Sequence, residues 1–424
     1  MSAPSPQRAL LVLFAVNVLN FYDRIVPGAL AEPIRKEFSL SDAQLGWLTT
    51  AFTLLYAVVG LPLARLADRT SRRRVLAAGV AVWTSLTAVA GVASTYAILL
   101  FSRLGVAVGE AVCAPAATSW IGDLFPSQQR SRAMATFMLA VPMGGSLGFF
   151  ICGPLGQAFG WRTAVVLAAA PGLVLVPLLL RLHEPRRGAV DKPVLPTSPW
   201  SILRIPTMWW IIASGALLNF NMYVVAAFLP AFVSRIHGLS LAQAGVAAGI
   251  TYGLGGILGG LASGAWGDRA GRHRPDGRML AAAATALLAA PLSAAGIVQP
   301  SGRPLAALLL IGCAYGLLNA YYGLVYASIQ EVVGPSLRAT AMAIYFLFMY
   351  LGGASFGPLL TGALSDHLAR QAAGGGPITE AARAVGLHQA MLVVPVLSIG
   401  LSAVLWAGSR TIRRDAAMPT PVPA

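Results

Sequence analysis

Four ionisable residues lie inside runs of apolar residues that are long enough to cross a membrane. Asp23 and Arg24 interrupt the run "VNVLNFYDRIVPGAL", and Arg103 and Glu110 lie in a later run. A charged side chain at the centre of a membrane-spanning helix costs about 2.5 to 3.5 kcal/mol, so such residues usually face an internal cavity and find partners. Arg103 and Glu110 are separated by two helical turns and therefore share one helix face. Two carboxylates beside compensating cations are suited to binding and releasing protons.

Two interpretations of these four residues stay open. In the first, Asp23 and Glu110 exchange a proton, and Arg103 pairs with whichever carboxylate is ionised. In the second, the four residues form a static network of ion pairs, which contributes little net stability. Arg24 points about 100 degrees around the helix from Asp23, so it either takes part in substrate binding or extends to the outer membrane interface.

The composition shows which solvent most of the chain faces. Hydrophobic residues make up 57% of the 424 residues and charged residues 11%, which is far from the composition of a soluble domain. Apolar runs of about 20 residues, enough to cross the hydrocarbon core as a helix, recur along the chain. The first run keeps Asn17 and Asn20 and is followed by no small-residue cleavage site, so it is predicted to be a retained helix. We expect twelve membrane-spanning helices, near residues 8–31, 43–66, 74–94, 97–121, 131–159, 162–182, 206–232, 242–266, 279–299, 304–333, 337–366 and 386–409.

The distribution of basic residues predicts the orientation in the membrane. With an even number of spans both termini lie on one side, and the loops on that side hold most of the 30 Lys and Arg residues. By the positive-inside rule, this side is cytoplasmic. We therefore expect a multi-pass protein of the cell inner (plasma) membrane with cytoplasmic N- and C-termini. The three cysteines all fall inside spans without disulfide or metal spacing, so no metal site is expected.

The two halves of the sequence repeat one another at an offset of about 200 residues. The segment "LNF" at Leu19 returns at Leu218, and "LSDAQLG" from Leu40 returns as "LSLAQAG" from Leu239. Such repetition predicts two six-helix bundles. We place them at residues 1–182 and 206–424, joined by a Pro-rich, charged cytoplasmic linker at 183–205.

The C-terminal half lacks counterparts of the intramembrane charges. The counterparts of Asp23 and Arg24 are Met222 and Tyr223, and the counterpart of Glu110 falls near Leu318 and Asn319. Ion chemistry is therefore assigned to the first half, and polar but uncharged side chains remain in the second. The residues predicted to bind substrate are Arg24, Asn20, Asn219, Asn319 and Tyr322.

The loops after the second and the eighth span carry related motifs. The sequences "ADRTSRRR" and "GDRAGRHR" resemble the signature loop of the major facilitator superfamily, in which a small residue precedes an Asp-Arg pair and a basic cluster. The resemblance implies a latch that closes the cytoplasmic side, although Ala64 and Ser71 replace two of the usual glycines in the first copy. The alternative is that these charges only enforce topology. With "DLFPSQQRSRAMA" and "EVVGPSLRATAMA", the motifs supply the predicted gating residues Asp68, Arg69, Arg72, Asp123, Arg130, Asp268, Arg269, Arg272, Glu331 and Arg338.

Three further segments narrow the resemblance. The sequences "NFYDR", "QLGWLTTAFTLLYAVVGLPLARLADR" and "SRLGVAVGEA" resemble the spinster branch of the superfamily, whose members move sphingosine phosphate or lysophospholipids. The resemblance implies an all-α membrane fold of twelve helices in two pseudo-symmetric bundles, alternating access, and functional roles for the matching Asp23, Arg103 and Glu110. From the residues themselves we expect a cavity with a charged N-terminal wall and an apolar, tyrosine-rich C-terminal wall, which suits an amphiphile with a polar or anionic head. The tyrosines near Tyr322 also fit simple helix packing.

Three classes of function are compared. The sequence favours a proton-coupled secondary active transporter of lysolipid-like or other amphiphilic compounds, including drugs. We expect it to act as a monomer in the lipid bilayer, with no cofactor and no nucleic-acid partner, and with a proton gradient as its energy source. The alternative is a symporter for a small organic anion such as a sugar acid, which needs a more polar cavity than the second half supplies. A membrane sensor or enzyme would need a signalling domain or a catalytic constellation, and the two G-x-S-x-G segments lack the required strand-turn-helix context and an intramembrane histidine.

Overall fold

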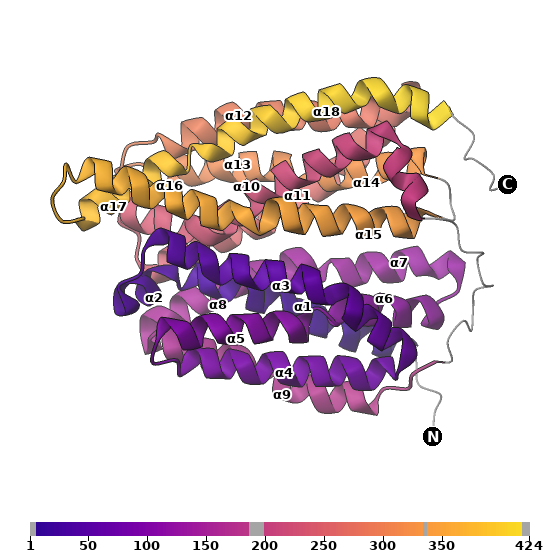
Figure 1. Ribbon diagram of the computed structural model, residues 1–424, viewed down its shortest axis with the longest axis horizontal. Coiled ribbons are helices and arrows are strands. Elements are labelled where there is room, and N and C mark those ends of the chain that lie inside the picture. The colour runs from indigo at the N-terminus through magenta and orange to yellow at the C-terminus, as the bar shows by residue number, and fades with distance from the viewer. Residues whose placement is uncertain (1–5, 186–198, 334–336, 418–424) are drawn as a thin grey trace. The chain divides into compact units, whose positions relative to one another are not determined.

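Helices account for the regular structure in the part of the chain that is described. The computed structural model describes residues 6–185, 199–333 and 337–417. Within these ranges, twelve helical stretches are long and apolar enough to cross a membrane, at positions that match the twelve predicted spans. The all-α membrane fold is therefore confirmed (Figure 1).

The described residues divide into two compact units. The first unit contains the described residues of 1–193 together with Leu239–Gly249, and the second contains those of 194–238 and 250–424. Most of the predicted linker at 183–205 lies outside the described residues. The helices of the first unit are α1 (Pro6–Ala29), α2 (Ala31–Phe38), α3 (Asp42–Arg69), α4 (Arg72–Gly91), α5 (Tyr96–Glu110), α6 (Cys113–Leu124), α7 (Ser127–Met138), α8 (Ala140–Phe159) and α9 (Trp161–Arg181).

The second unit is built from a corresponding series of helices. It begins with a short 3-10 turn. A π-helical turn with the sequence "YLGGA" follows α15 and interrupts the eleventh span of the chain. The first residues of α11 are grouped with the first unit. The elements are η1 (Pro199–Arg204), α10 (Pro206–His237), α11 (Leu241–His273), α12 (Gly277–Ile297), α13 (Pro304–Asn319), α14 (Tyr321–Val332), α15 (Arg338–Met349), η3 (Tyr350–Ala354), α16 (Phe356–Ala372), α17 (Glu380–Ala390) and α18 (Val393–Ala417).

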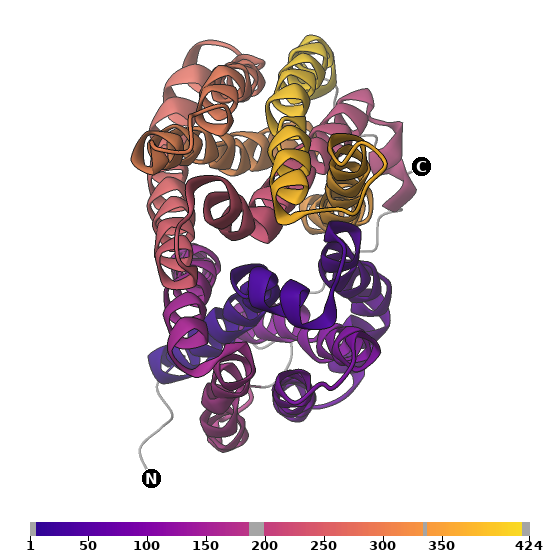
Figure 2. The same ribbon diagram turned by 90° about the vertical axis from the view of Figure 1, so that its left-hand side faces the viewer.

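Both units use the same helix pairings. In the first, α4 packs against α5 and α9, and in the second α12 packs against α13 and α18. Likewise, α1 packs against α8 as α10 packs against η3 and α16. Figure 2 shows the helices of each unit nearly end-on. The repetition found in the sequence thus corresponds to a repeated packing scheme.

Two spans break at equivalent places. The fourth span is divided between α5, which ends at Glu110, and α6, which begins at Cys113. The tenth span is divided between α13, which ends at Asn319, and α14, which begins at Tyr321. The repeat therefore places a carboxylate at the break in the first unit and an amide at the break in the second.

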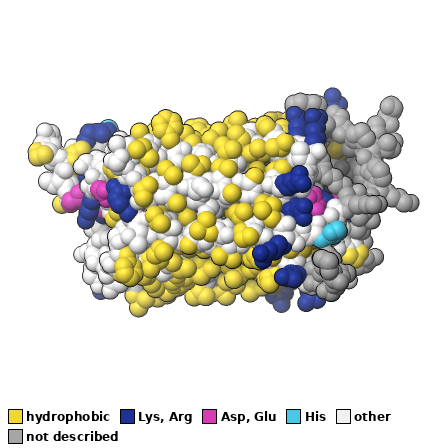
Figure 3. Space-filling view, turned by 90° about the horizontal axis from the view of Figure 1, so that it is seen from below, with side chains coloured by type: hydrophobic (Ala, Val, Ile, Leu, Met, Phe, Trp, Pro, Cys, Tyr) yellow, Lys and Arg dark blue, Asp and Glu magenta, His cyan; other side chains and the backbone are white. Residues whose placement is uncertain are grey.

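The surface has the distribution expected for a protein in a bilayer. On the face drawn in Figure 3, hydrophobic side chains cover the broad middle zone, and Lys and Arg gather toward the two ends. Basic side chains at both ends of an apolar zone are typical of the boundaries between lipid and water.

Candidate functional site

The candidate site is a cluster of charged side chains inside the first unit. Helix α1 contributes Asp23 and Arg24, and α5 contributes Arg103 and Glu110. All four side chains are at least nine-tenths buried. The structure thus brings together the four intramembrane charges that the sequence singled out.

The cluster consists of two ion pairs that cross between α1 and α5. Arg24 Nε donates a hydrogen bond to Glu110 Oε2 over 2.9 Å. Arg103 Nη1 lies 3.6 Å from Asp23 Oδ2 and 3.5 Å from the backbone oxygen of the same residue. Each cation therefore has its own carboxylate. Arg24 does not extend to the membrane interface, because only 7% of its side chain is exposed.

Aromatic rings and a hydroxyl surround the two pairs. The Arg24 guanidinium lies 4.4 Å from the ring centre of Tyr56, and the guanidinium groups of Arg24 and Arg103 lie 5.4 and 4.9 Å from that of Phe52. Such cation-π contacts stabilise a buried cation by roughly 2 kcal/mol or more. Thr87 on α4 donates to Asp23 Oδ2 over 2.8 Å. Sequence reasoning missed Phe52, Tyr56 and Thr87, although Phe52 and Tyr56 share one face of the second span.

The cluster leaves hydrogen-bonding capacity unused. Oδ1 of Asp23, Oε1 of Glu110 and Nε of Arg103 are buried without a hydrogen-bond partner among the described residues. The Nδ2 of Asn20, a predicted substrate-binding residue one turn before Asp23, is in the same situation. An unsatisfied buried polar group costs about 1 to 3 kcal/mol. In native proteins such groups are satisfied by an ordered water or an ion, or they serve a functional role.

Glycines hold α1 in place beside this cluster. A Cβ added to Gly144 on α8 would overlap the carbonyl oxygen of Val18 and approach Phe21 Cβ to 2.9 Å. One helical turn farther along, a Cβ at Gly148 would lie 2.9 Å from the carbonyl oxygen of Tyr22. The absence of side chains lets the two helices touch at their backbones. The backbone that carries Asp23 and Arg24 is thereby fixed by direct helix contact.

The predicted polar residues of the second unit are partly connected. Tyr322 donates a hydrogen bond to Asn219 Oδ1 over 3.1 Å, and Asn219 donates in turn to the carbonyl oxygen of Gly215. Asn319 lies half-buried at the break between α13 and α14. Tyr321 is fully buried and hydrogen-bonds to Ser214, so this tyrosine packs the unit. Tyr322 is only half-buried, which leaves part of its ring accessible.

Two of the predicted gating residues of the first unit, Arg72 and Asp123, form an ion pair where α4 begins. The buried guanidinium of Arg72 contacts Asp123 on α6 and also donates to Glu184 Oε1 over 3.3 Å. Arg130 Nη2 donates to the carbonyl oxygen of Gly122 over 2.9 Å. The side chain of Asp68 lies outside the described residues, and Arg69 is exposed. Glu184, which lies three residues after the end of α9, was not predicted from the sequence.

The second unit repeats this arrangement with one change. Arg338 Nη2 donates to the carbonyl oxygen of Gln330 as Arg130 does to Gly122. Glu331, the counterpart of Asp123, pairs with Arg278. The offset of the motifs had indicated Arg272, which is exposed along with Arg269, and the side chain of Asp268 lies outside the described residues. Arg278 takes the structural place of Arg72 because each lies in the first turn of its helix, α12 or α4.

Glu184 is expected to stabilise the fold in a way that depends on pH. It accepts hydrogen bonds from Ser71 Oγ and from the backbone N–H groups of Arg72 and Arg73. Partial burial acts to raise the pKa of Glu184, but these hydrogen bonds outweigh it and hold the pKa below the ordinary value of 4.5. A lowered pKa stabilises the fold above the unfolded-state value and loses that effect as the pH falls through the native value. Glu184→Gln should therefore lower the thermal unfolding midpoint at neutral pH, by an amount that shrinks below pH 4.5.

The measurement is the midpoint of both proteins in detergent across that pH range. Glu380→Gln, at an exposed position on α17, is the matched control and should lower the midpoint less than Glu184→Gln does. A difference between wild type and Glu184→Gln that grows on acidification would contradict the assignment.

Residues 13–358 of the chain match the family described as "Major Facilitator Superfamily". An "MFS-type efflux pump" of Mycolicibacterium smegmatis is 32% identical over 412 residues, covering 96% of this chain and 93% of the relative. "Protein spinster homolog 1" of Homo sapiens is 30% identical over 395 residues, with coverage of 86% and 75%. A "Probable L-galactonate transporter" of Escherichia coli is 26% identical over 382 residues, with coverage of 84% and 83%.

The fold comparison leads to the same group. A crystal structure of a bacterial homolog of the human lysosomal transporter spinster, in an inward-facing and unoccupied conformation, superposes with a TM-score of 0.88. The two chains are 29% identical, and the match covers 99% of this chain and 100% of the other. Family and fold are those of transporters and not those of enzymes. The chain belongs to the major facilitator superfamily and is a spinster-like, multi-pass membrane member of it.

Proposed function

We propose that this protein is a proton-coupled secondary active transporter that carries an amphiphilic, lysolipid-like substrate by alternating access. The observation that carries the proposal is the buried cluster of two carboxylates and two guanidinium groups in the first unit. The proton gradient is the proposed energy source, and no cofactor is required. The proposed location is the inner membrane with cytoplasmic termini, on the basis of the positive-inside rule.

Proton binding and substrate binding are linked through the ion pairs. A proton on Glu110 removes the charge that holds Arg24, and a proton on Asp23 does the same for Arg103. A guanidinium released in this way offers N–H donors to an anionic headgroup, and a charge-assisted hydrogen bond of this kind is about twice as strong as a neutral one. The unpaired Oδ1 of Asp23 and Oε1 of Glu110 are the atoms at which a proton can be added without breaking a hydrogen bond. Each proton then biases the protein between its two conformations.

The substrate class is inferred from the side chains of each unit considered separately. The first unit offers cations and the amide of Asn20, which suit a polar or anionic head. The second unit offers Tyr322, Asn219 and aromatic neighbours such as Tyr326, whose ring centre lies 5.6 Å from that of Tyr322. Aromatic faces with few charges suit an apolar tail. The resemblance of "NFYDR" and "SRLGVAVGEA" to the spinster branch adds support for an amphiphile.

The second candidate substrate is a small organic anion such as a sugar acid. The relative described as a probable L-galactonate transporter favours it, and the guanidinium groups of Arg24 and Arg103 suit a carboxylate as well as a phosphate. The two candidates differ in whether the substrate needs an apolar tail. This difference decides between them in a direct assay.

The test is proton flux in proteoliposomes that contain a pH-sensitive dye. The vesicles are given lysophospholipids, cationic drugs and sugar acids in turn, and wild type is compared with Glu110→Gln. We expect flux with a lysophospholipid in wild type and its loss in Glu110→Gln, because the amide cannot bind the coupling proton. Glu380→Gln makes the same chemical change at an exposed position and should retain full flux.

Three other results of the flux assay would contradict parts of the proposal. Flux with sugar acids but not with lysophospholipids would show that the substrate is a small organic anion and not an amphiphile. Equal flux in wild type and Glu110→Gln would remove Glu110 from the coupling mechanism. Substrate binding without proton flux in wild type would contradict proton coupling as a whole.

A further inference from the structure

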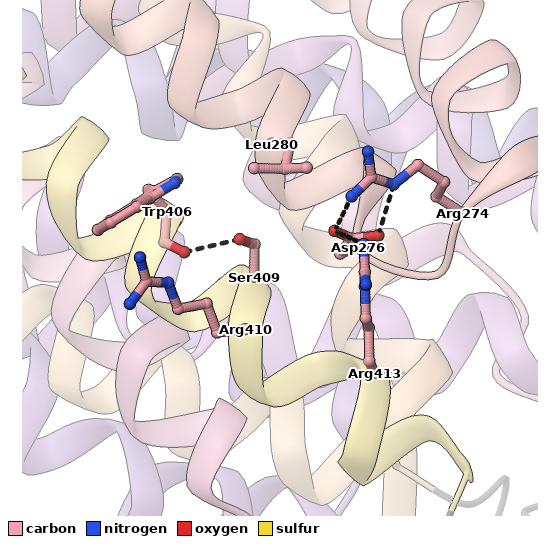
Figure 4. Close-up of a pocket in the computed structure, with 7 residues that line it drawn as sticks. All are labelled: Arg274, Asp276, Leu280, Trp406, Ser409, Arg410 and Arg413. Carbon is pink, nitrogen blue, oxygen red and sulfur yellow. Dashed lines mark hydrogen bonds and ion pairs between the residues drawn. The ribbon is translucent and has the colours of Figure 1, made fainter.

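A second polar site lies in the other unit, at the ends of two packed helices. The start of α12 and the end of α18 line an open cavity of about 360 Å³. Its lining combines basic, acidic and apolar side chains (Figure 4). The lining residues are Arg274, Asp276, Leu280, Trp406, Ser409, Arg410 and Arg413. None of these residues belongs to the charged cluster described above or to its ion pairs.

The cavity carries an excess of positive charge. Three arginines share it with one carboxylate, the buried Asp276. Arg274 Nη2 and Arg413 Nη2 both reach Asp276 Oδ2, over 3.0 and 2.9 Å. A guanidinium has five N–H donors, so each of these two arginines keeps donors beyond those used on Asp276. One carboxylate between two cations leaves the group short of negative charge.

Arg410 is the cation without a carboxylate. Its guanidinium lies 3.7 Å from the ring centre of Trp406, and it has no ion-pair partner within the described ranges. The side chain is exposed, as are Arg274 and Arg413. In Figure 4, Arg274 and Arg413 converge on Asp276 at one side, and Arg410 lies with Trp406 at the other. The cavity between them therefore has N–H donors available on two sides.

The cavity lies where a lipid-facing surface ends. On α18, the exposed residues follow helical spacing through Val396, Ile399, Ala403 and Trp406 to Arg410. On α12, which packs beside α18, Leu287 and Leu288 are more than half exposed. The apolar stretch of α12 begins at Gly277 and that of α18 ends at Asp415. An apolar surface that leads into basic side chains at the membrane boundary is complementary to a lipid molecule. The acyl tails fit along the helices, and the headgroup fits in the cavity.

We propose that this cavity binds the phosphate headgroup of an anionic phospholipid whose acyl chains lie along α12 and α18. Basic pockets between membrane helices are a known way to hold such headgroups. Arginine suits phosphate because its planar N–H groups match two oxygens at once. The indole of Trp406 occupies the interfacial level that tryptophan favours. This proposal is independent of the transport function proposed above.

The test is lipid binding to the purified protein, measured by native mass spectrometry with added phosphatidylglycerol or phosphatidylcholine. We expect wild type to retain phosphatidylglycerol preferentially. Arg410→Gln should weaken phosphatidylglycerol binding about tenfold, as expected for the loss of one charge-assisted hydrogen bond. Because Arg410 has no ion-pair partner in the described structure, this change leaves no buried carboxylate unpaired. Arg383→Gln, at another position on the second unit outside the cavity, is the matched control and should bind like wild type.

A further arm separates a lipid from a free anion. Inorganic phosphate at millimolar concentration should not displace phosphatidylglycerol, because it gains nothing from the apolar surface of α12 and α18. Displacement by phosphate alone would overturn the lipid and leave a site for soluble anions. Equal binding of the two phospholipids, or equal binding by wild type and Arg410→Gln, would overturn the site itself.

Discussion

Asp23→Asn will abolish the accumulation of substrate against a concentration gradient while leaving substrate binding measurable. With a pH difference of one unit and one proton per cycle, wild type can accumulate a neutral substrate about tenfold, because one pH unit is equivalent to about 1.4 kcal/mol. The amide in the variant has no proton to exchange, so accumulation should fall to equilibration. The measurement is the ratio of substrate inside and outside proteoliposomes under an imposed gradient, together with binding to the purified protein.

A control for folding is needed because Asp23 holds Arg103. Removing one member of a buried ion pair typically destabilises a protein by about 3 to 5 kcal/mol. The double variant Asp23→Asn/Arg103→Gln removes both charges and should regain much of the thermal stability without regaining accumulation. Full accumulation by Asp23→Asn would show that Asp23 does not couple protons to transport. Recovery of accumulation in the double variant would show that the single change acted only through stability.

Gly144→Ala will destabilise the protein and disturb the charged cluster, although the change adds one methyl group. The new Cβ would overlap the carbonyl oxygen of Val18 and crowd Phe21 Cβ at 2.9 Å. The contact partners are backbone and Cβ atoms, so α1 itself must shift. Overpacking of this kind costs about 1 to 3 kcal/mol. We expect a lower thermal unfolding midpoint and reduced proton flux, because the segment that shifts carries Asp23 and Arg24.

Gly60→Ala is the matched control for this prediction. A Cβ at Gly60 on α3 would meet no atom within 4 Å. A helical Gly→Ala change without a clash gains roughly 0.5 to 1 kcal/mol. The control should therefore be as stable as wild type or more stable. A Gly144→Ala protein with an unchanged midpoint and unchanged flux would mean that α1 and α8 are free to separate by the width of a methyl group.

The sequence was sufficient for the fold because membrane spans leave a strong signal. Long apolar runs and their repetition depend only on residue type and order, and they predicted the twelve spans. The burial of the charges was also predictable, since Asp23, Arg103 and Glu110 lie inside these apolar runs. The ion-pair partner of each charge could not be predicted from the sequence. Arg24 pairs with Glu110, whereas the sequence offered two other roles for Arg24.

Contacts that depend on three-dimensional proximity were missed for a physical reason. Phe52 contacts the guanidinium groups through its ring face, and Thr87 contacts Asp23 through its hydroxyl. A single sequence does not show which residues of two helices face each other. Arg278 was missed because α11 and the connection after it are together longer than α3 and its connection, so a constant offset identified Arg272 instead. Glu184 lies after the end of α9 and accepts hydrogen bonds from residues at the start of α4. No local sequence pattern indicates such a contact between two separate segments.

The charge balance of the site has a consequence for the energy supply of the protein. Asp23 and Glu110 together neutralise Arg24 and Arg103, so the cluster has no net charge when both carboxylates are ionised. One added proton gives it a charge of +1. Moving one elementary charge through a membrane potential of 100 mV changes its energy by about 2.3 kcal/mol. In the proton-coupled cycle proposed above, in which this charge moves with the cluster, the protonated cluster responds to voltage when its substrate is neutral, and a substrate with one negative charge makes the same step electrically silent.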